Sequence, residues 1–469
     1  MTLHKIKCAS YIGSLLIIGL CFYYSFINAP GTYETIVYSS LAQIAIFIYG
    51  YYGLGRIGKS MISAYLLFMV LFYLFQNGQI ILYAIGISFD TFYIEKYDLE
   101  LLLKVIVFST LCLIMAFVAG VFSIPERTKT QFISSVNNFR EKSVLAVAKK
   151  GCLITSTIAF PIMFVKFYIC ATSGYFAVIE FAENTPSIVK VIEKLFLGFC
   201  ILVLVYAKPK STPQKMTSCL LIVWSLLAVF SGDRTVGLAG ITTLAFYNFK
   251  SASDKNIGKN MLTLLGAGVA VIYLIGIAFS FRMQQSTEVQ GISGTIIDAV
   301  SQLGFSFFPL VLTMDICPSI HNYVYGKSLI GGLVSGLIPN NFDPLGIFDV
   351  FSEWSSEPAG WIESDFDYNF GIDFSLTAEC YANFGWWGWI AMFFLCSIVA
   401  KLLKNLDFKR RDNLYDQYTC LVLLYSWFTL PRRKSYYIYN NWFWYVLAVT
   451  IILYLAISKT NRQNKCQNR

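Results

Sequence analysis

The chain has 469 residues and a net charge of +9, with 56% hydrophobic and only 13% charged residues. Soluble globular domains are about 45–50% apolar and about 25% charged, so this composition excludes a soluble enzyme. The aromatic share of 17% excludes a disordered chain. We therefore predict an all-α fold, that of a polytopic integral membrane protein.

Apolar runs that approach twenty residues recur along the chain, and that length crosses roughly 30 Å of hydrocarbon. The first run has a basic start and no small-residue cleavage site, so we expect it to be retained as a span. The sequence predicts about 12 transmembrane helices, over residues 9–27, 35–54, 61–84, 102–122, 151–170, 189–206, 217–231, 235–249, 261–280, 381–400, 414–430 and 438–457.

The orientation of these spans follows from the positions of Lys and Arg. With both termini in the cytoplasm, the inside segments and adjoining span ends hold 25 of the 36 basic residues but only six of the 27 acidic ones. Cytoplasmic loops of membrane proteins carry this excess of Lys and Arg. The overall charge of +9 therefore reflects topology and does not indicate nucleic-acid binding.

One outside segment is far longer than the others. It divides the chain into transmembrane helices 1–9 (residues 1–281), a large outside loop (residues 282–380), and transmembrane helices 10–12 with a cytoplasmic tail (residues 381–469). The 73 residues between Lys327 and Lys401 contain no Lys or Arg but nine carboxylates, with aromatic residues interleaved. A structured loop of this length is usually functional. Apolar residues at helical spacing near its start predict a helix on the membrane surface: Ile296, Val300, Leu303, Phe307 and Leu310.

A few basic residues lie on the outside, against the positive-inside bias. Arg234, Arg282, Arg432 and Arg433 belong to three separate outside turns at span ends. If they converge, their guanidinium groups form a bidentate site for phosphate or pyrophosphate. The alternatives are snorkelling to headgroups or pairing with a loop carboxylate. Asp233 is interpreted as an N-cap that directs a helix N-terminus at the same anion, rather than as a catalytic acid.

A second group of polar residues enters the tenth predicted span. If this stretch is helical, Glu379 and Asn383 share one face, because they are four residues apart. A carboxylate at the apolar boundary suits a general base that takes a proton from a hydroxyl. Structural pairing of Glu379 with an outside arginine is the alternative, and the two roles are compatible.

The cysteines and histidines give weaker signals. A disulfide between Cys317 and Cys380 is one hypothesis, since both lie near the outside loop. The chain has two histidines, too few for a histidine metal site. His321 is a second candidate base, and the pair Asp365 and Asp367 is a candidate for Mg²⁺.

Four short motifs together resemble the bacterial O-antigen polysaccharide polymerases (Wzy), over about residues 225–445. They are Gly232-Asp233-Arg234, Tyr325-Gly326-Lys327-Ser328, Ala378-Glu379-x-Tyr381-x-Asn383-Phe384-Gly385, and Pro431-Arg432-Arg433.

The resemblance implies a membrane-embedded glycosyltransferase of the bacterial inner membrane that needs no metal or other cofactor. Its substrate would be undecaprenyl-pyrophosphate-linked oligosaccharide, joined at the periplasmic face, and a chain-length regulator would be its partner. The implied catalytic residues are Glu379, Arg282 and Arg234. The implied substrate-binding residues are Arg432, Arg433, Asp233, Tyr381, Asn383 and Lys327.

Two other functions fit part of this pattern. An O-antigen ligase shares the topology and the long loop, and would depend on His321. A lipid-linked oligosaccharide flippase or transporter commonly has twelve spans with both ends inside. However, a transporter has no need of a 100-residue outside loop, and the sequence shows no matching halves.

Overall fold

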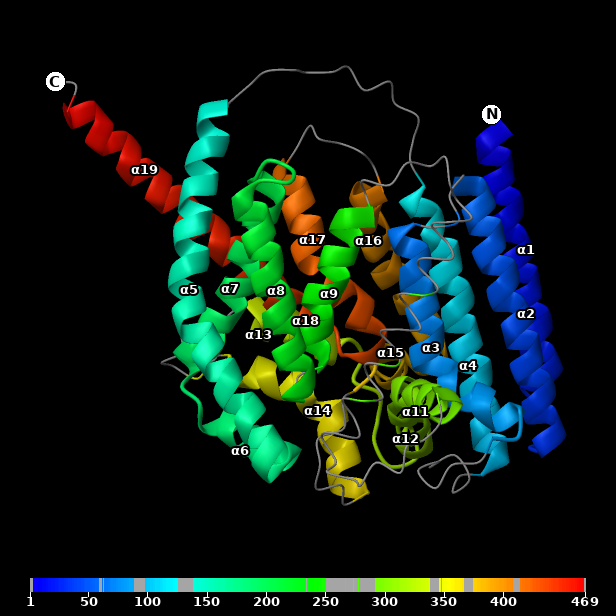
Figure 1. Cartoon of the computed structure of the whole chain (residues 1–469). Coiled ribbons are helices and arrows are strands. Elements are labelled where there is room, and N and C mark those ends of the chain that lie inside the picture. Colours follow the sequence, from blue (N-terminus) through cyan, green and yellow to red (C-terminus); the bar gives the residue numbers. More distant parts are fainter. Residues whose placement is uncertain are drawn as a thin grey trace. The chain divides into compact units, whose positions relative to one another are not determined.

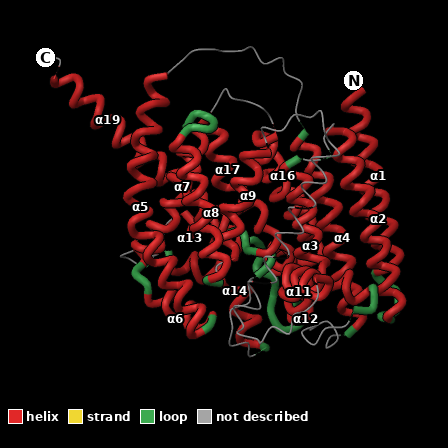
Figure 2. The backbone as a smooth tube through the Cα atoms, in the orientation of Figure 1, coloured by secondary structure: helices red, strands yellow, loops and turns green. Residues whose placement is uncertain are grey.

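A computed structural model describes residues 3–58, 61, 63–87, 98–124, 138–232, 234–249, 266, 273, 277, 292–337, 346, 348–366, 374–407 and 414–467. These residues form helices joined by loops and turns, and none of them is in a strand (Figure 2). The predicted all-α class is confirmed.

The chain packs as two compact units that interleave along the sequence. Unit 1 contains Met1–Arg127, Ile297–Phe408 and Trp427–Tyr439, and unit 2 contains Thr128–Ile296, Lys409–Ser426 and Asn440–Arg469. These units are defined by packing. The division at residues 281 and 380 concerns placement in the membrane and stays a prediction.

Unit 1 is built around long helices that run side by side: α1, α2, α4 and α16 (Figure 1). Side chains of Ser63 and Asp98 cap the N-termini of α3 and α4 by accepting hydrogen bonds from the first helical turn. The helices of this unit are α1 (Leu3–Phe26), α2 (Tyr33–Gly58), α3 (Ala64–Ala84), α4 (Leu99–Ala119), α11 (Ile292–Gly304), α12 (Phe308–Ile316), α13 (Lys327–Leu337), α14 (Asp349–Asp365), α15 (Leu376–Phe384) and α16 (Gly388–Asp407).

Unit 2 is a second helical bundle, in which α5 packs on α6, α7 and α8, and α8 packs on α9. Lys166 of α5 forms a salt bridge of 2.8 Å with Glu193 of α7. Both side chains are largely buried, as expected for charges that enter an apolar bundle as a pair. The helices of this unit are α5 (Asn138–Ser173), α6 (Tyr175–Asn184), α7 (Ser187–Tyr206), α8 (Thr212–Phe230), α9 (Arg234–Phe249), α17 (Leu414–Thr429), η8 (Phe443–Ala448) and α19 (Val449–Gln467). Helix α18 (Tyr436–Trp442) crosses the boundary between the units, as do the first residues of α11 and the last residues of α17.

Eight helices among the described residues are long and apolar enough to cross a membrane. Seven overlap predicted spans: His4–Phe26, Ala64–Ala84, Leu99–Ser123, Glu141–Ser173, Thr212–Phe230, Leu376–Lys404 and Tyr436–Ser458. The predicted spans 35–54, 189–206, 235–249 and 414–430 are helical but fall below this threshold, and α9 and α17 have only 16 residues each. The predicted span 261–280 lies almost wholly outside the described residues. The chain is therefore a multi-pass helical membrane protein, and the count of twelve stays a prediction.

The eighth helix long and apolar enough, Ile296–Ile316, falls where the sequence predicted a helix on the membrane surface. The segment is helical, but α12 packs on α4 and α15. Ala299, Phe307 and Leu310 are fully buried. Protein side chains cover the apolar face that the amphipathic pattern suggested for lipid.

Cys317 and Cys380 are both free and buried, so the disulfide hypothesis is wrong. Burial raises the pKa of the Cys317 thiol to about 11, and the negative charge of Asp365 adds to this rise. The thiol therefore stays protonated near neutral pH, which is the unreactive form.

Candidate active site

The structure brings three of the four family-like motifs together within unit 1. The segment before α13 runs along the end of α15, with hydrogen bonds from Val324 N to Ala382 O (3.0 Å) and from Tyr325 N to Asn383 O (3.1 Å). The Pro431-Arg432-Arg433 motif lies in η7 (Leu430–Arg432) and the turn that leads to α18. It is joined to α15 by the side chain of Glu379, which accepts a hydrogen bond from Ser435 N. Motifs far apart in the sequence therefore form one site.

Two glycines shape the backbone of this site. Gly326 has φ +88° and donates its N–H to Asn383 Oδ1 at 2.9 Å. Gly385 ends α15 with φ +56°, and a Cβ atom there would lie 2.6 Å from the ring of Tyr323. Because L side chains rarely adopt such φ values, these positions favour glycine.

Glu379 lies on α15, whose N-terminus is capped by Ser375. The Glu379 side chain is fully enclosed, with 1% of its surface exposed. Its Oε2 accepts a hydrogen bond from Ser435 N (2.7 Å), and its Oε1 accepts one from Ser435 Oγ (2.9 Å). Ser328 Oγ donates to the same Oε1 at 3.4 Å, and the ammonium of Lys434 adds a favourable charge interaction. The carboxylate therefore holds the C-terminal end of the turn that contains Arg432, Arg433 and Lys434.

A buried amide on α3 holds the other end of that turn. Gln76 is fully buried, and its Nε2 donates to the carbonyl oxygen of Pro431 at 2.7 Å. Its Oε1 accepts a hydrogen bond from Thr377 Oγ1 at 2.6 Å. Gln76 thus ties α3 to both the turn and α15.

Between these two ties lie three consecutive cations, Arg432, Arg433 and Lys434, which we call the basic turn. All three are half-buried. The Arg433 guanidinium lies 4.5 Å from the ring centroid of Tyr437, and Lys434 Nζ donates to Ser355 O at 3.3 Å. A turn with two fixed ends and stacked side chains presents its positive charge in a defined place, as electrostatic stabilisation of an anion requires.

The other predicted site residues divide into enclosed, exposed and undescribed ones. Tyr381 is 3% exposed and packs edge-on against Phe108 (ring centroids 5.1 Å apart). Asn383 is fully buried and donates its Nδ2 to Ser328 Oγ and to Glu379 O, both at 2.6 Å. These contacts favour supporting roles for both residues. Lys327 begins α13 and is exposed.

The remaining motif belongs to unit 2. Gly232 adopts φ +93° beside the ring of Tyr175, and Arg234 begins α9. The side chain of Arg234, and the whole of Asp233 and Arg282, lie outside the described residues. Their roles stay predictions.

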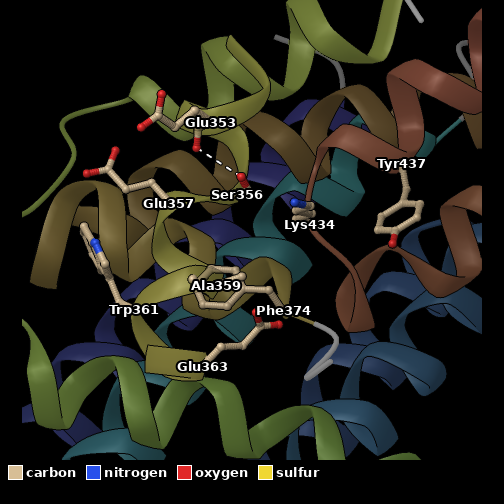
Figure 3. Close-up of a pocket in the computed structure, with 10 residues that line it drawn as sticks. Glu353, Ser356, Glu357, Ala359, Trp361, Glu363, Phe374, Lys434 and Tyr437 are labelled. Atoms are coloured by element: carbon tan, nitrogen blue, oxygen red, sulfur yellow. Dashed lines mark hydrogen bonds between the residues drawn. The ribbon is translucent and has the colours of Figure 1, made fainter. Parts of the chain in front are cut away.

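A cavity of about 590 Å³ adjoins the basic turn within unit 1 (Figure 3). Helix α14 supplies three carboxylates to its lining, Glu353, Glu357 and Glu363. Lys434 of the basic turn and Tyr437 of α18 also line the cavity. The volume is within the range of about 300–1,000 Å³ that is usual for ligand pockets.

His321 lies at the edge of this region and is engaged by its neighbours. Its Nε2 is 2.7 Å from Asp365 Oδ2, and its ring stacks on Trp361 with centroids 4.5 Å apart. Within the described parts of the chain, no group of three or more His, Cys, Asp or Glu could hold a metal ion. Asp367 lies outside those parts, so the Mg²⁺ hypothesis for Asp365 and Asp367 stays untested.

Sequence reasoning missed Gln76, Ser435 and the α14 carboxylates as members of this region. A signal for Gln76 exists, because Gln76, Asn77 and Gln79 interrupt an apolar span where polar side chains are costly. Ser435 gives no such signal, since serine is common after a turn.

Comparison with known proteins adds independent information about the chain as a whole. A protein-family model described as "O-antigen polysaccharide polymerase Wzy" matches residues 10–465. No curated protein and no solved structure matches the chain. The family match covers nearly the whole sequence, including residues 10–231, which precede all four motifs.

Proposed function

Because this chain belongs to the O-antigen polysaccharide polymerase Wzy family, we propose that it joins undecaprenyl-pyrophosphate-linked oligosaccharide repeat units. The donor is the growing glycan on its lipid pyrophosphate, and the acceptor is a sugar hydroxyl at the non-reducing end of a new unit. The reaction takes place at the periplasmic face of the bacterial inner membrane. This is the specific form of the O-antigen polymerisation and lipopolysaccharide biosynthesis that the family performs.

The basic turn is the observation that carries this proposal. In the reaction, the acceptor oxygen forms a bond to the anomeric carbon while the bond from that carbon to the pyrophosphate oxygen breaks, and the proton of the acceptor hydroxyl is released to water. Negative charge develops on the leaving pyrophosphate. Guanidinium groups that are already fixed in position stabilise such charge well. Arg432 and Arg433 meet this condition, because both ends of their turn are held by hydrogen bonds.

Arg234 and Arg282 are proposed to complete the pyrophosphate site, as the sequence predicts. Their support is their place in the sequence, at outside span ends against the positive-inside bias. Asp233 is proposed to cap α9 and so to direct the positive end of that helix dipole at the same anion.

For Glu379 we propose a positioning role in place of the predicted general base. Both of its carboxylate oxygens accept hydrogen bonds from Ser435, and the side chain is 1% exposed. A base must reach the proton that it takes, directly or through one water. A carboxylate that holds the basic turn instead acts through the arginines.

The location and the partner of the enzyme are also part of the proposal. We propose both termini in the cytoplasm and the basic turn on the periplasmic side, on the strength of the distribution of Lys and Arg. A separate chain-length regulator is proposed as the protein partner.

A strain that lacks this gene tests the proposed function directly. We expect lipopolysaccharide whose core carries a single repeat, because repeat units still reach the periplasm and are still ligated. Loss of a ligase would instead leave uncapped core with chains on the lipid carrier. Loss of a flippase would leave no surface repeat. Electrophoresis of lipopolysaccharide separates these outcomes, and either of the last two overturns the proposal.

A further inference from the structure

The cavity beside the basic turn has an unusual lining for an anion-binding protein. Glu353 and Glu363 are exposed, and Glu357 is half-buried. None of these three carboxylates forms a salt bridge within the described residues. Ionised carboxylates are costly in hydrocarbon, so this wall faces water.

This lining disfavours the two non-sugar parts of the substrate. Three carboxylates repel a pyrophosphate at close range. They also make the cavity a poor place for a lipid tail, because an apolar chain cannot replace the water around a charge. What the wall offers is acceptors for O–H and N–H donors.

The aromatic residues of the cavity complete the pattern. Trp361, Phe374 and Tyr437 line it together with the three carboxylates (Figure 3). One face of Trp361 is covered by the ring of His321, with the two planes 3° apart, and His321 is fixed in turn by Asp365. Trp361 is therefore held at a set angle and meets the cavity with the rest of its surface. Flat aromatic surfaces suit the C–H faces of sugar rings, and carboxylates suit their hydroxyl edges.

We propose that this cavity is a saccharide subsite for a neutral or amino sugar of the repeat unit, with Glu357 and Trp361 as its central contacts. The inference rests on the proposed function and names the part of the substrate that the cavity takes. Lys434 marks the boundary between the subsite and the basic turn, because it lines the cavity and belongs to that turn. A repeat unit bound here would have its reducing-end pyrophosphate or its acceptor hydroxyl near the arginines.

The test uses full-length protein in lipid nanodiscs and the oligosaccharide repeat unit of the host bacterium, released from its lipid by mild acid. Calorimetry gives the Kd of this oligosaccharide, and polymerisation of the lipid-linked unit gives KM and kcat. We expect Glu357→Gln and Trp361→Leu each to raise both Kd and KM about tenfold, the effect of losing about 1.4 kcal/mol of binding. We expect kcat to change little, because binding and not chemistry is affected.

Asp349→Asn is the matched control. Asp349 lies on the same helix and is exposed, but it does not line the cavity. Its replacement by Asn removes one negative charge, as Glu357→Gln does. We expect its Kd and KM to equal those of the wild type. Trp361→Phe replaces Trp361→Leu if the latter does not fold, and it should have an intermediate Kd. A repeat unit oxidised to carboxylates at its primary hydroxyls should bind less tightly to the wild type.

Unchanged Kd and KM in both Glu357→Gln and Trp361→Leu, with an active wild type, would overturn the subsite. An equal loss in Asp349→Asn would also overturn it, since the effect would then be general charge. Absence of polymer from the wild type overturns the proposed function itself, and this inference with it.

Discussion

Glu379 is the residue for which base catalysis and positioning predict different mutant behaviour. A glutamine can still accept the hydrogen bond from Ser435 N and donate to Ser435 Oγ, but it cannot take a proton. Positioning therefore predicts that Glu379→Gln keeps most of the polymerisation rate while Glu379→Ala loses it. Removal of a general base would cost about 10²–10⁴-fold in both variants.

Polymerisation rates of purified Glu379→Gln and Glu379→Ala, at matched amounts of folded protein, measure this difference. Ser435→Ala should reproduce part of the Ala effect, because it removes the Oγ contact and keeps the backbone one. Equal rates for Gln and Ala, both far below the wild type, would restore Glu379 as the base.

The arginines give a second prediction for single residues. Replacing Arg432 or Arg433 with Ala should lower the polymerisation rate about 10²–10³-fold, the usual cost of one lost transition-state contact. Lys should rescue poorly, since it keeps the charge but loses the two-pronged fit to phosphate oxygens. The same order, wild type above Lys above Ala, is expected at Arg234 and Arg282.

The length of the lipopolysaccharide ladder at matched expression reports this order. Lys401→Ala is the control, since Lys401 is also a basic residue that lies over an aromatic ring, with its Nζ 5.2 Å from the ring centroid of Phe122. It should leave the ladder intact. Full ladders from the Lys variants would mean that the arginines anchor helices to headgroups and that the anion site lies elsewhere.

At the scale of helices, α3 acts on the site from a distance through one side chain. Gln76→Ala removes the amide that ties α3 to Pro431 O and Thr377 Oγ1. Leaving buried polar groups without partners costs about 1–3 kcal/mol of unfolding free energy. We expect a lower Tm and, in addition, a shorter glycan ladder per unit of folded protein.

Gln43→Ala separates these two effects. Gln43 is equally buried and also ties helices together, because its Nε2 donates to Thr110 Oγ1 of α4 at 2.8 Å. Its hydrogen bonds within the described residues go to Ser109 and Thr110 and not to the basic turn, so its loss should lower Tm and leave the ladder per unit of protein unchanged. Ladders that shorten equally in both variants would show that stability alone governs activity.

The same helices show what local sequence patterns can predict. The four-residue spacing of Glu379 and Asn383 places them on one face if the stretch is helical, and helix α15 contains both. Its bounds follow from the Ser375 cap and from Gly385, which has a positive φ. The tie from Gln76 to Pro431 joins residues 355 positions apart. No periodicity or spacing encodes such a contact, because it depends on how finished helices pack.

At the scale of the whole molecule, the topology is the open prediction that matters most. Reporter fusions after Asp233, Tyr368 and Arg433 should read periplasmic, and fusions after Arg140 and Arg410 should read cytoplasmic. The reason is the excess of basic residues in the second group of segments. Alkaline phosphatase and green fluorescent protein activities measure the two sides. A cytoplasmic signal at Tyr368 or Arg433 would remove the periplasmic site from the proposed function.

Composition alone was sufficient for the class of this molecule, an all-helical membrane protein, because hydrocarbon thickness and backbone hydrogen bonding leave few alternatives. It was less informative about the segment 296–316. There, an amphipathic pattern has the same appearance whether lipid or protein covers its apolar face. Only the packing of α12 on α4 and α15 distinguishes the two.

The interleaving of the two units has a mechanical meaning for the basic turn. Residues 427–439 belong to unit 1, but the chain immediately before and after them belongs to unit 2. Any displacement of unit 2 during a catalytic cycle would therefore pull on this short stretch from both ends. The hydrogen bonds at Pro431 and Ser435 hold the two ends of the basic turn, so they would resist this displacement before it reached the three cations. Loss of either hydrogen bond would let the arginines follow any displacement of unit 2. Substitution of Gln76 or Glu379 would therefore both misplace the positive charge of the basic turn and make its position depend on unit 2.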